Sequence, residues 1–302
     1  MNKLTAWLVC ATLAFVGQAQ SRSFDDVVSS GELIVGAYRD FPPFSYQQDG
    51  QPAGVDIEIG QAIADEMGLK MKVHWAIPDE NLEDDLRNNV WKGHYLDKDD
   101  ENPLALKRLA DVMMRIPYDR EYAFRQDSQT GEMVNEQVVM FGPYQRESWR
   151  VAFDTERLEA VKTMAVFQYH SIGVEIDSLP DFYLSSAFAG RMRKNVHHFP
   201  TPRAAFGAMK LGEVTAVMAM RSEIDALLYT ENNPRYQLAE NGFPTLGKQK
   251  WDVGMAVKST YRQLGYAVEE VVDKMVRDGR MAEIFSHYGI TYELPGLYQD
   301  VK

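Results

Sequence analysis

The sequence contains a single cysteine, Cys10, which lies in the first apolar stretch of the chain. A mature chain without that stretch has no disulfide, no cysteine nucleophile and no cysteine ligand for zinc. The sequence also lacks H-E-x-x-H, G-x-S-x-G and P-loop motifs, which are common signs of catalysis. The adjacent pair His197-His198 falls in a strand pattern, where neighbouring side chains point to opposite faces and do not easily share a metal.

Positive charge is scarce. The chain has 32 Lys and Arg against 44 Asp and Glu, a formal net charge of -12. This balance argues against nucleic acid and anionic membranes as partners, because both favour basic patches. The composition is otherwise that of a globular protein, and 302 residues are enough for two domains.

Long apolar runs are absent. Leu4 to Val16 is too short to span a bilayer, but it follows Lys3 and has the length of a signal-peptide core. Gly17-Gln18-Ala19 then supplies small residues for a signal peptidase. We expect a signal peptide over 1–19, cleaved near Ala19, and an exported periplasmic protein. An uncleaved anchor is the alternative.

Hydrophobic periodicity predicts a parallel sheet near the start of the mature chain. An apolar strand over 33–38 is followed by a helix over 57–67, with Ile59, Ile63 and Met67 on one face. Alternating residues over 69–75 then predict a second strand. A strand, a helix and a strand in this order form a βαβ unit.

The same alternation recurs later in the chain. Thr201 is predicted to cap a helix, and Ser222-Glu223-Ile224-Asp225 has the pattern of a capping box. There is no tandem repeat and no linker rich in Pro, Gly or Ser. The sequence therefore predicts an α/β protein with two α/β units. The later strands are expected at 172–175, 196–199, 214–220 and 252–257, and the later helices at 181–189, after Thr201, from Ser222, at 261–278 and at 281–288.

Residues 91–110 are polar and acidic and are interpreted as an insertion in the first unit. Asp97, Asp99 and Glu101 alternate as in a calcium loop, but Asn102 stands where glycine is needed and Arg108 where a bidentate glutamate is needed. A solvated acidic loop is the preferred interpretation.

Several segments together resemble a known family. Gly31-Glu32-Leu33-Ile34-Val35-Gly36 leads to Pro42-Pro43-Phe44, and Gly54-Val55-Asp56-Ile57-Glu58-Ile59 follows. The order of these segments and of the later ones resembles the family 3 extracellular solute-binding proteins, the polar amino acid receptors of ABC importers. Residues 111–120 look more like the branch associated with quinoprotein alcohol dehydrogenases. The later matching segments are Gly142-Pro143-Tyr144, Ile172-Gly173-Val174, 205–217, 251–257 and 278–289.

This resemblance implies a type II periplasmic binding protein, in which two α/β lobes are joined by two hinge strands. Lobe one would comprise 20–146 plus 252–302, and lobe two 147–251. The ligand would lie in the crevice outside the carboxyl ends of the strands, and the lobes would close around it.

The resemblance also places a carboxylate-binding arginine, for which Arg120 is the candidate and Arg115 the fallback. A guanidinium offers a planar, bidentate fork to a carboxylate. The alternative for Arg120 is a surface arginine paired with Asp119 or Glu121.

Three aromatic residues after the first strand, Tyr38, Phe41 and Phe44, are candidates for the cleft wall. One or two of them could instead be core residues. Asp56 matches the family's aspartate at a helix start, and an N-cap role for it is favoured over ligand contact. Ser178 precedes a predicted helix whose backbone N–H groups could bind an anion; the alternative is an ordinary loop with a serine cap.

The second lobe departs from the family at the ammonium-binding aspartates, since Thr215 and Met220 stand in their places. Arg221 follows and adds positive charge. We therefore expect an anionic organic solute and not a standard amino acid. In the alternative, Arg221 points to solvent and Glu223 or Asp225 holds an amine.

The favoured function is a non-catalytic receptor, without metal or cofactor, that delivers a solute to a membrane ABC permease. One alternative is an accessory protein of a periplasmic quinoprotein dehydrogenase, with 91–110 as the partner surface. Another is an enzyme like the cyclohexadienyl dehydratases, which share the fold. Catalysis needs an acid with a raised pKa, and the sequence offers Asp56, Glu175 and Glu223 without a persuasive pair.

Overall fold

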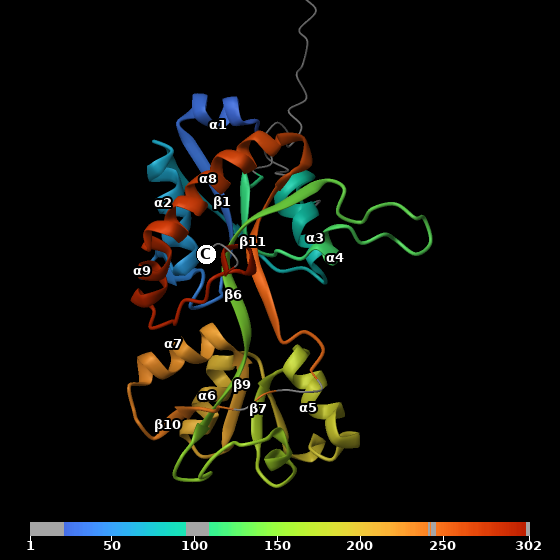
Figure 1. The fold of residues 1–302 in the computed structure, drawn as a ribbon, viewed down its shortest axis with the longest axis vertical. Coiled ribbons are helices and arrows are strands. Elements are labelled where there is room, and N and C mark those ends of the chain that lie inside the picture. The colour runs from blue at the N-terminus through green and yellow to red at the C-terminus, as the bar shows by residue number, and fades with distance from the viewer. Residues whose placement is uncertain (1–20, 95–108, 241, 243–245, 300–302) are drawn as a thin grey trace, which may run out of the picture.

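The protein forms two α/β lobes in the computed structural model, which describes residues 21–94, 109–240, 242 and 246–299 (Figure 1). The predicted signal peptide with Cys10 and the calcium-like loop over 97–108 lie outside these ranges.

The first lobe is built on a mixed sheet with the strand order β4-β1-β5-β11-β6. β1 (Glu32–Tyr38) pairs in parallel with β4 (Lys70–Ala76) and with β5 (Val112–Pro117). The helix α2 (Val55–Glu66) connects β1 to β4, so the predicted βαβ unit is present. Ile59 and Ile63 on one face of α2 are buried against this sheet, as their spacing predicts.

Helices α8 and α9 cover the first lobe together with α2 (Figure 1). α8 (Arg262–Asp278) ends at Gly279, whose φ of 89° is a left-handed cap, and α9 (Arg280–His287) follows directly. The smaller elements of this lobe are α1 (Phe24–Ser30), β2 (Tyr46–Gln48), β3 (Gln51–Ala53), α3 (Leu82–Leu86), a π-helical turn (Arg87–Trp91), α4 (Arg120–Ala123), a 3-10 turn (Ser259–Tyr261) and α10 (Gly296–Gln299).

The second lobe continues the sheet in the order β6-β9-β7-β8, with β10 on the other side of β6. β7 pairs in parallel with both β8 and β9, so the carboxyl ends of these strands share one edge. The elements are β7 (Ile172–Glu175), α5 (Leu179–Gly190), β8 (Val196–Phe199), α6 (Pro202–Lys210), β9 (Ala216–Met220), α7 (Arg221–Glu231), β10 (Tyr236–Leu238) and 3-10 turns at Met164–Gln168 and Arg193–Asn195.

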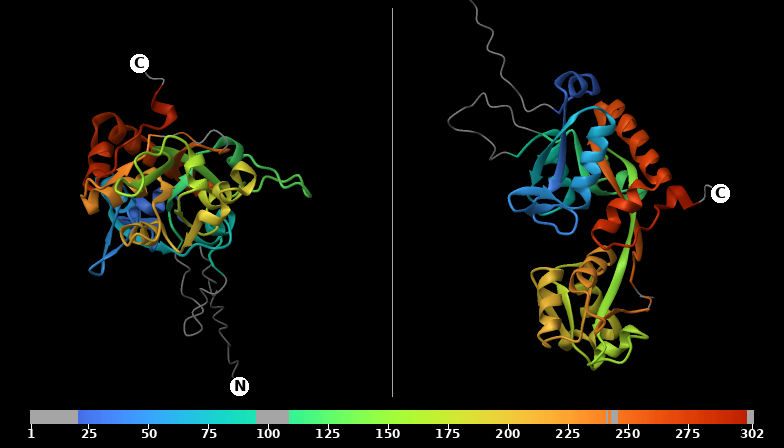
Figure 2. Two further views of the ribbon diagram at one scale, coloured as in Figure 1. Left: turned by 90° about the horizontal axis from the view of Figure 1, so that it is seen from below. Right: turned by 90° about the vertical axis from the view of Figure 1, so that its left-hand side faces the viewer.

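Two long strands connect the lobes, as the side view in Figure 2 shows. β6 (Val138–Asp154) pairs with β11 (Lys250–Lys258) as far as Ser148, and from Trp149 onward it pairs with β9. The rings of Trp149 and Trp251 lie 4.9 Å apart where the pairing changes. The two lobes therefore share a continuous sheet backbone but have separate apolar cores.

Two predicted caps are wrong in position. α2 begins at Val55 with Gly54 as N-cap, so Asp56 lies inside the helix and its carboxylate is not a cap. α7 begins at Arg221, so the capping carboxylate is that of Glu223, which accepts from the Met220 N–H at 3.2 Å. The predicted cap by Thr201 is confirmed, since its hydroxyl accepts from the Ala204 N–H at 3.1 Å.

A substitution at Gly54 would test the packing around the start of α2. Its φ is 119°, and a Cβ there would lie 2.3 Å from the Phe44 carbonyl oxygen. Gly54→Ala should therefore lower the free energy of unfolding by about 2 kcal/mol or more, because both backbone and packing must shift. The measurement is chemical denaturation.

The matched control is Gly207→Ala in α6, where a Cβ would meet nothing within 4 Å. That substitution should leave stability unchanged or raise it by up to about 1 kcal/mol, because alanine favours a helix. Equal stabilities for the two variants would contradict the packing assigned to Gly54.

Candidate functional site

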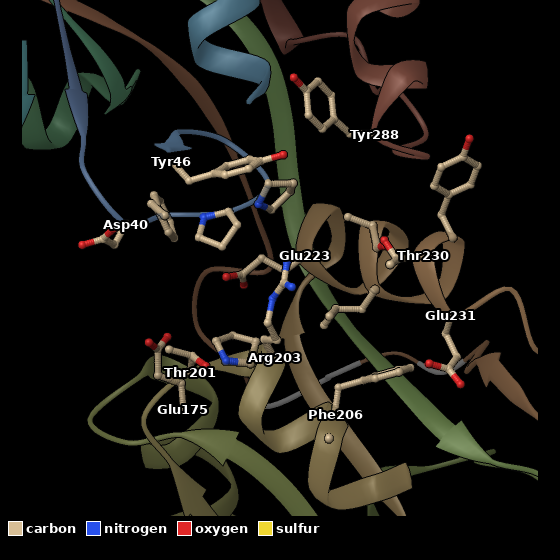
Figure 3. A pocket seen from close by; sticks show the side chains of 18 of the residues that line it. Asp40, Tyr46, Glu175, Thr201, Arg203, Phe206, Glu223, Thr230, Glu231 and Tyr288 are labelled. Atoms are coloured by element: carbon tan, nitrogen blue, oxygen red, sulfur yellow. The ribbon is translucent and has the colours of Figure 1, made fainter. Parts of the chain in front are cut away.

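A cleft of about 660 Å³ lies between the lobes, at the carboxyl ends of the parallel strands. Figure 3 shows its lobe-one side, with Tyr46 and Tyr288, facing a lobe-two side that carries Glu175, Arg203 and Glu223. Open α/β sheets place ligands at this edge because loops diverge there. The cleft is therefore the candidate binding site.

Much of the cleft surface is aromatic. Phe41 and Tyr46 follow β1, Tyr288 follows α9, and Phe206 and Tyr229 come from α6 and α7. Tyr288 is held in place because its hydroxyl donates to Glu58 at 2.7 Å and accepts from the Gly54 N–H at 3.0 Å. These rings provide apolar contact area with fixed orientation.

Three carboxyl groups lie on the lobe-two side; Glu231 is paired with Lys210, and Glu175 and Glu223 form no ion pair with another described residue. Glu175 is the last residue of β7, and Glu223 is in the first turn of α7 with 6% of its surface exposed. Burial raises the pKa of Glu223 to about 8, with further contributions from the charges of Glu175 and Glu147. Burial also raises the pKa of Glu175. Glu223 is therefore mostly protonated at pH 7.

The positive groups of the cleft are mostly engaged. Lys210 forms an ion pair with Glu231 at 2.5 Å, and His287 lies 2.8 Å from Glu58. Arg203, exposed in the first turn of α6, has no hydrogen bond or ion pair with another described residue. Arg203 is thus the cleft cation that remains available to a ligand.

Arg115, the fallback arginine of the sequence analysis, is buried at the junction with β6. Its Nε donates to Asp56 at 3.0 Å, its Nη2 donates to Gln145 at 2.6 Å, and its Cζ lies 3.3 Å from the centroid of the Phe44 ring. Tyr144 completes the cluster by donating to Asp56 at 2.8 Å. A guanidinium satisfied on this many sides has a structural role in this conformation.

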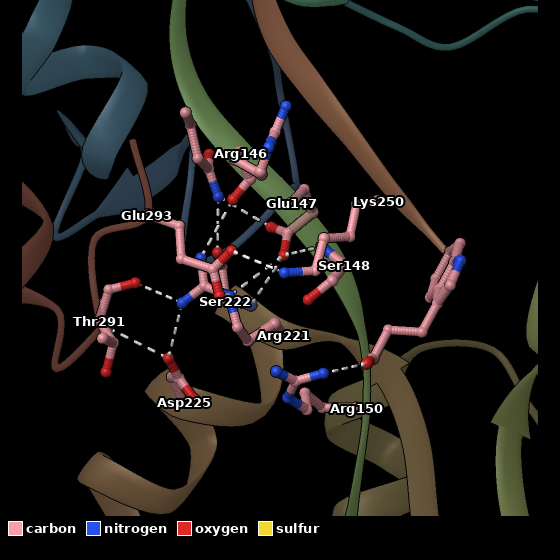
Figure 4. Close-up of polar contacts among 12 residues, drawn as sticks. Arg146, Glu147, Ser148, Arg150, Arg221, Ser222, Asp225, Lys250, Thr291 and Glu293 are labelled. Carbon is pink, nitrogen blue, oxygen red and sulfur yellow. Dashed lines mark hydrogen bonds and ion pairs between the residues drawn. The ribbon is translucent and has the colours of Figure 1, made fainter. Parts of the chain in front are cut away.

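Arg221 is also buried, with 3% of its surface exposed, and it does not line the cleft. Its side chain is directed toward Thr291 and Glu293 of the C-terminal segment (Figure 4). Its guanidinium donates to the carbonyl oxygens of Thr291 and Arg146 and forms an ion pair with Asp225 at 3.2 Å. Glu293 lies 3.6 Å from its Nε. Arg221 therefore connects the second lobe to residues 291–293 of the first.

The three predicted aromatic residues have different positions. Phe41 lines the cleft. Phe44 is fully buried in the core of the first lobe, and Tyr38 packs in a separate core cluster with its hydroxyl donating to Asp85 at 2.7 Å. The sequence could not distinguish them because all three follow the same strand.

The remaining predicted site residues do not line the cleft. Arg120 is exposed at the start of α4, with its guanidinium over the Phe124 ring. Ser178 caps α5 by accepting from the Asp181 N–H, which is the alternative given for it. Asp56 and Arg221 are engaged at the junction between the lobes.

Tyr46, Arg203 and Tyr288 were not identified from the sequence, and Glu175 and Glu223 were not recognised as a pair. The signal for the pair was available, since each residue stands at or just after the carboxyl end of a lobe-two strand. What was missing was the parallel pairing of β7 with β9. Within the described residues, no group of three or more His, Cys, Asp or Glu could hold a metal ion.

The junction generates a test of stability. Arg221→Met should lower the free energy of unfolding by about 3–5 kcal/mol, because the buried Glu147 and the partly buried Asp225 lose their positive partner. The exposed Arg120→Met is the control and should change stability by less than about 0.5 kcal/mol. Similar thermal unfolding of the two variants would contradict the role assigned to Arg221.

The raised pKa of Glu223 can be tested through the pH dependence of the free energy of unfolding. A group with a raised folded-state pKa binds its proton more tightly in the folded than in the unfolded protein, so the stability it supports is lost as pH rises between about 4.5 and 8. Glu223→Gln cannot ionise and should escape this loss. The stability of the variant relative to the wild type should therefore rise by roughly 3 kcal/mol between pH 5 and pH 8. A difference independent of pH would show that Glu223 is ionised throughout.

Comparison with known proteins places this cleft in context. Residues 33–91 match the model of the bacterial extracellular solute-binding proteins, family 3. A stretch of 57 residues is 39% identical to a cyclohexadienyl dehydratase of Pseudomonas aeruginosa, and it spans 18% of this chain and 21% of that protein.

Solved structures resemble almost the whole chain. An ancestral cationic amino acid solute-binding protein has a TM-score of 0.65 at 16% identity, over 87% of this chain and 98% of its own. An amino acid ABC transporter substrate-binding protein from Streptococcus pneumoniae, bound to L-arginine, has a TM-score of 0.58 at 19% identity. The match covers 88% of this chain and 97% of that protein. A histidine kinase sensor domain similar to periplasmic binding proteins also matches, with a TM-score of 0.56 at 16% identity, over 87% of this chain and 98% of its own.

At these identities the structural matches establish the fold. They confirm the predicted two-lobed α/β architecture of a periplasmic binding protein. None of the helices in the described ranges is both long and apolar enough to cross a membrane. The chain therefore matches the model of the bacterial extracellular solute-binding proteins, family 3, over residues 33–91, and it shares its fold with solved amino-acid-binding proteins.

Proposed function

We propose that this protein captures a small organic solute in the interlobe cleft and does not transform it. One observation carries the proposal: residues of both lobes line a cleft of about 660 Å³ at the carboxyl ends of the strands. That volume is in the range of small-molecule sites. A solute bound there would contact both lobes at once.

Closure of the lobes is part of the proposal. β6 and β11 are the strands that run between the lobes in the described structure, and the cleft side chains lie on either side of them. A rotation about these strands would bring Tyr46 and Tyr288 toward Glu223 without breaking either core. The solute would then exchange its water for contacts with both lobes.

The cellular setting follows from the sequence and the relatives. With the expected signal peptide over 1–19, the protein would be exported to the periplasm. One solved relative is described as the substrate-binding protein of an amino acid ABC transporter. We propose that this chain likewise delivers its solute to an ABC permease.

The predicted preference for an anion loses much of its support. It relied on Arg120, which lies outside the cleft, and on Arg221, which is engaged with Asp225 and Thr291. Arg203 could still contact a carboxylate. The charge of the solute therefore depends on the side chains that line the cleft.

Dehydration of a small solute is a second candidate, favoured by Glu175 and Glu223. Elimination of water requires a proton for the departing hydroxyl, and a carboxyl group with a pKa of about 8 holds one at neutral pH. The dehydratase of Pseudomonas aeruginosa matches part of this chain. Under this candidate, Glu223→Gln would retain binding and lose turnover.

A spin-label experiment tests capture. With Cys10→Ser as background, nitroxides would be placed at Gln47→Cys in lobe one and Leu211→Cys in lobe two, both exposed. The solute panel would contain amino acids, carboxylates, aromatic acids and amines. A captured solute should shorten the interlobe distance by more than about 2 Å, measured by pulsed electron resonance.

The control pair places both labels on lobe one, at Gln47→Cys and Val28→Cys, and its distance should not change. If thermal shift detected a bound solute while the interlobe distance stayed constant, closure would be excluded. If no solute of any class produced either effect, the capture function itself would fail.

A further inference from the structure

We propose that Glu175 and Glu223 form a receptor for a positively charged group, so that the captured solute is a small organic cation bearing an amine or a guanidinium. This inference rests on the proposed capture function and specifies its ligand class. It replaces the anion expected from the sequence.

The fold brings the two carboxyl groups together. β7 and β9 are parallel neighbours, with Ile172 opposite Ala216 and Gly173 opposite Val217. Glu175 ends β7, and Glu223 lies in the first turn of the helix that follows β9. Both side chains extend into the cleft from the same edge of the sheet (Figure 3). A ligand resting on lobe two would therefore meet both.

Among the residues that the structure describes, no Lys or Arg pairs with either of these two carboxyl groups. Within the described ranges, neither Glu175 nor Glu223 forms an ion pair, and the Glu223 carboxyl group accepts a hydrogen bond from the Met220 N–H. Arg221 is adjacent in sequence but turns toward Asp225 and Thr291. A buried carboxyl group without a counter-ion is costly, and a positively charged ligand would remove that cost.

The remaining cleft charges favour the same ligand. Lys210 and Glu231 neutralise each other, which leaves Asp40 and Glu175 against Arg203 among the lining residues, and ionisation of Glu223 would add a further negative charge. Such a cleft has a negative potential and attracts cations. Arg115 on the lobe-one side is paired with Asp56 and does not line the cleft, so it acts on Glu223 only from a distance.

The opposite wall suits an organic cation better than a metal ion. Tyr46 and Tyr288 face the carboxyl groups across the cleft (Figure 3), and Phe41 lines the same wall. Aromatic faces attract ammonium and guanidinium groups, and the attraction is stronger when water is excluded. Closure of the lobes would place the cation between the rings and the carboxyl groups.

Binding of a cation would release a proton. The groups that act on Glu223 are the carboxylates of Glu175 and Glu147, which favour its neutral form, and Arg115 and the Met220 N–H, which favour the ionised form. The other charged or titratable groups of the lining are Asp40, Arg203, the Lys210–Glu231 ion pair, and His287, which lies beside Glu58. A bound cation also favours the ionised form of Glu223, so its binding is coupled to loss of the Glu223 proton. The affinity for the cation should therefore rise with pH up to about 8.

The experiment is a calorimetric and thermal-shift titration of the full chain with agmatine, putrescine and choline as cations. Succinate and benzoate are the anions, and L-arginine is the zwitterion that differs from agmatine by one carboxylate. At least one cation should bind, and its affinity should be at least about fivefold higher at pH 8.5 than at pH 6.5. The heat should depend on the buffer in the direction of proton release.

Glu223→Gln and Glu175→Gln should each weaken that binding at least tenfold. Glu213→Gln is the control, because this exposed lobe-two glutamate lies outside the cleft lining, and it should change affinity less than twofold. Binding of L-arginine but not of agmatine would assign the site to zwitterions and overturn the inference. Equal affinity of the wild type and both variants for the cation would also overturn it.

The outcomes separate this inference from capture itself. If an anion alone binds and shortens the interlobe distance, capture stands and the cation receptor is wrong. If none of the cations binds, the receptor is also contradicted. The variants remain informative if one of them folds poorly, because the two carboxyl groups are tested independently.

Discussion

Buried charge at the lobe junction is the constraint on which the other features of the structure depend. Gln145 and Glu147 have no exposed surface where β6 passes from one lobe to the other. Gln145 accepts from Arg115 on one side and donates to Ser222 at 2.6 Å on the other. Such groups are tolerated only when each one has a partner. Arg115 and Arg221 meet that need, and they are therefore directed away from the cleft.

This arrangement determines the electrostatics of the binding site. With those two arginines engaged at the junction, the cleft retains Arg203 as an available cation, while Glu175 and Glu223 have no counter-ion among the described residues. The fold is that of amino-acid-binding proteins, but a shared fold does not transfer a ligand. The specificity of this protein must come from its own side chains at the edge of the sheet.

Capture and dehydration, the two proposed functions, depend on the same protonated carboxyl group. Glu223 is neutral at pH 7 because it is buried beside other carboxylates. If the solute brings a positive charge, the group ionises and binds it; if the solute brings a departing hydroxyl group, the group can donate its proton. The difference between a receptor and an enzyme on this scaffold can therefore rest on the ligand presented to one side chain.

Local sequence was sufficient for much of the fold. The spacing of Ile59 and Ile63, the alternation over 69–75 and the cap at Thr201 each predicted an element that is present. These signals are local because helix and strand periods repeat within a few residues. The starts of α2 and α7 were misplaced by one or two residues, since several polar residues near each start could serve as the cap.

The sequence by itself determined the α/β class, the two units and the aromatic segment after β1 that contributes Phe41 to the cleft. The tertiary structure alone decided which arginines are free. Arg115 meets Asp56 from 59 positions away, and Arg221 meets Thr291 from 70 positions away. No local pattern encodes such pairs. A buried charge is costly unless it is paired, and the folded chain decides which partner lies close enough to pair with it.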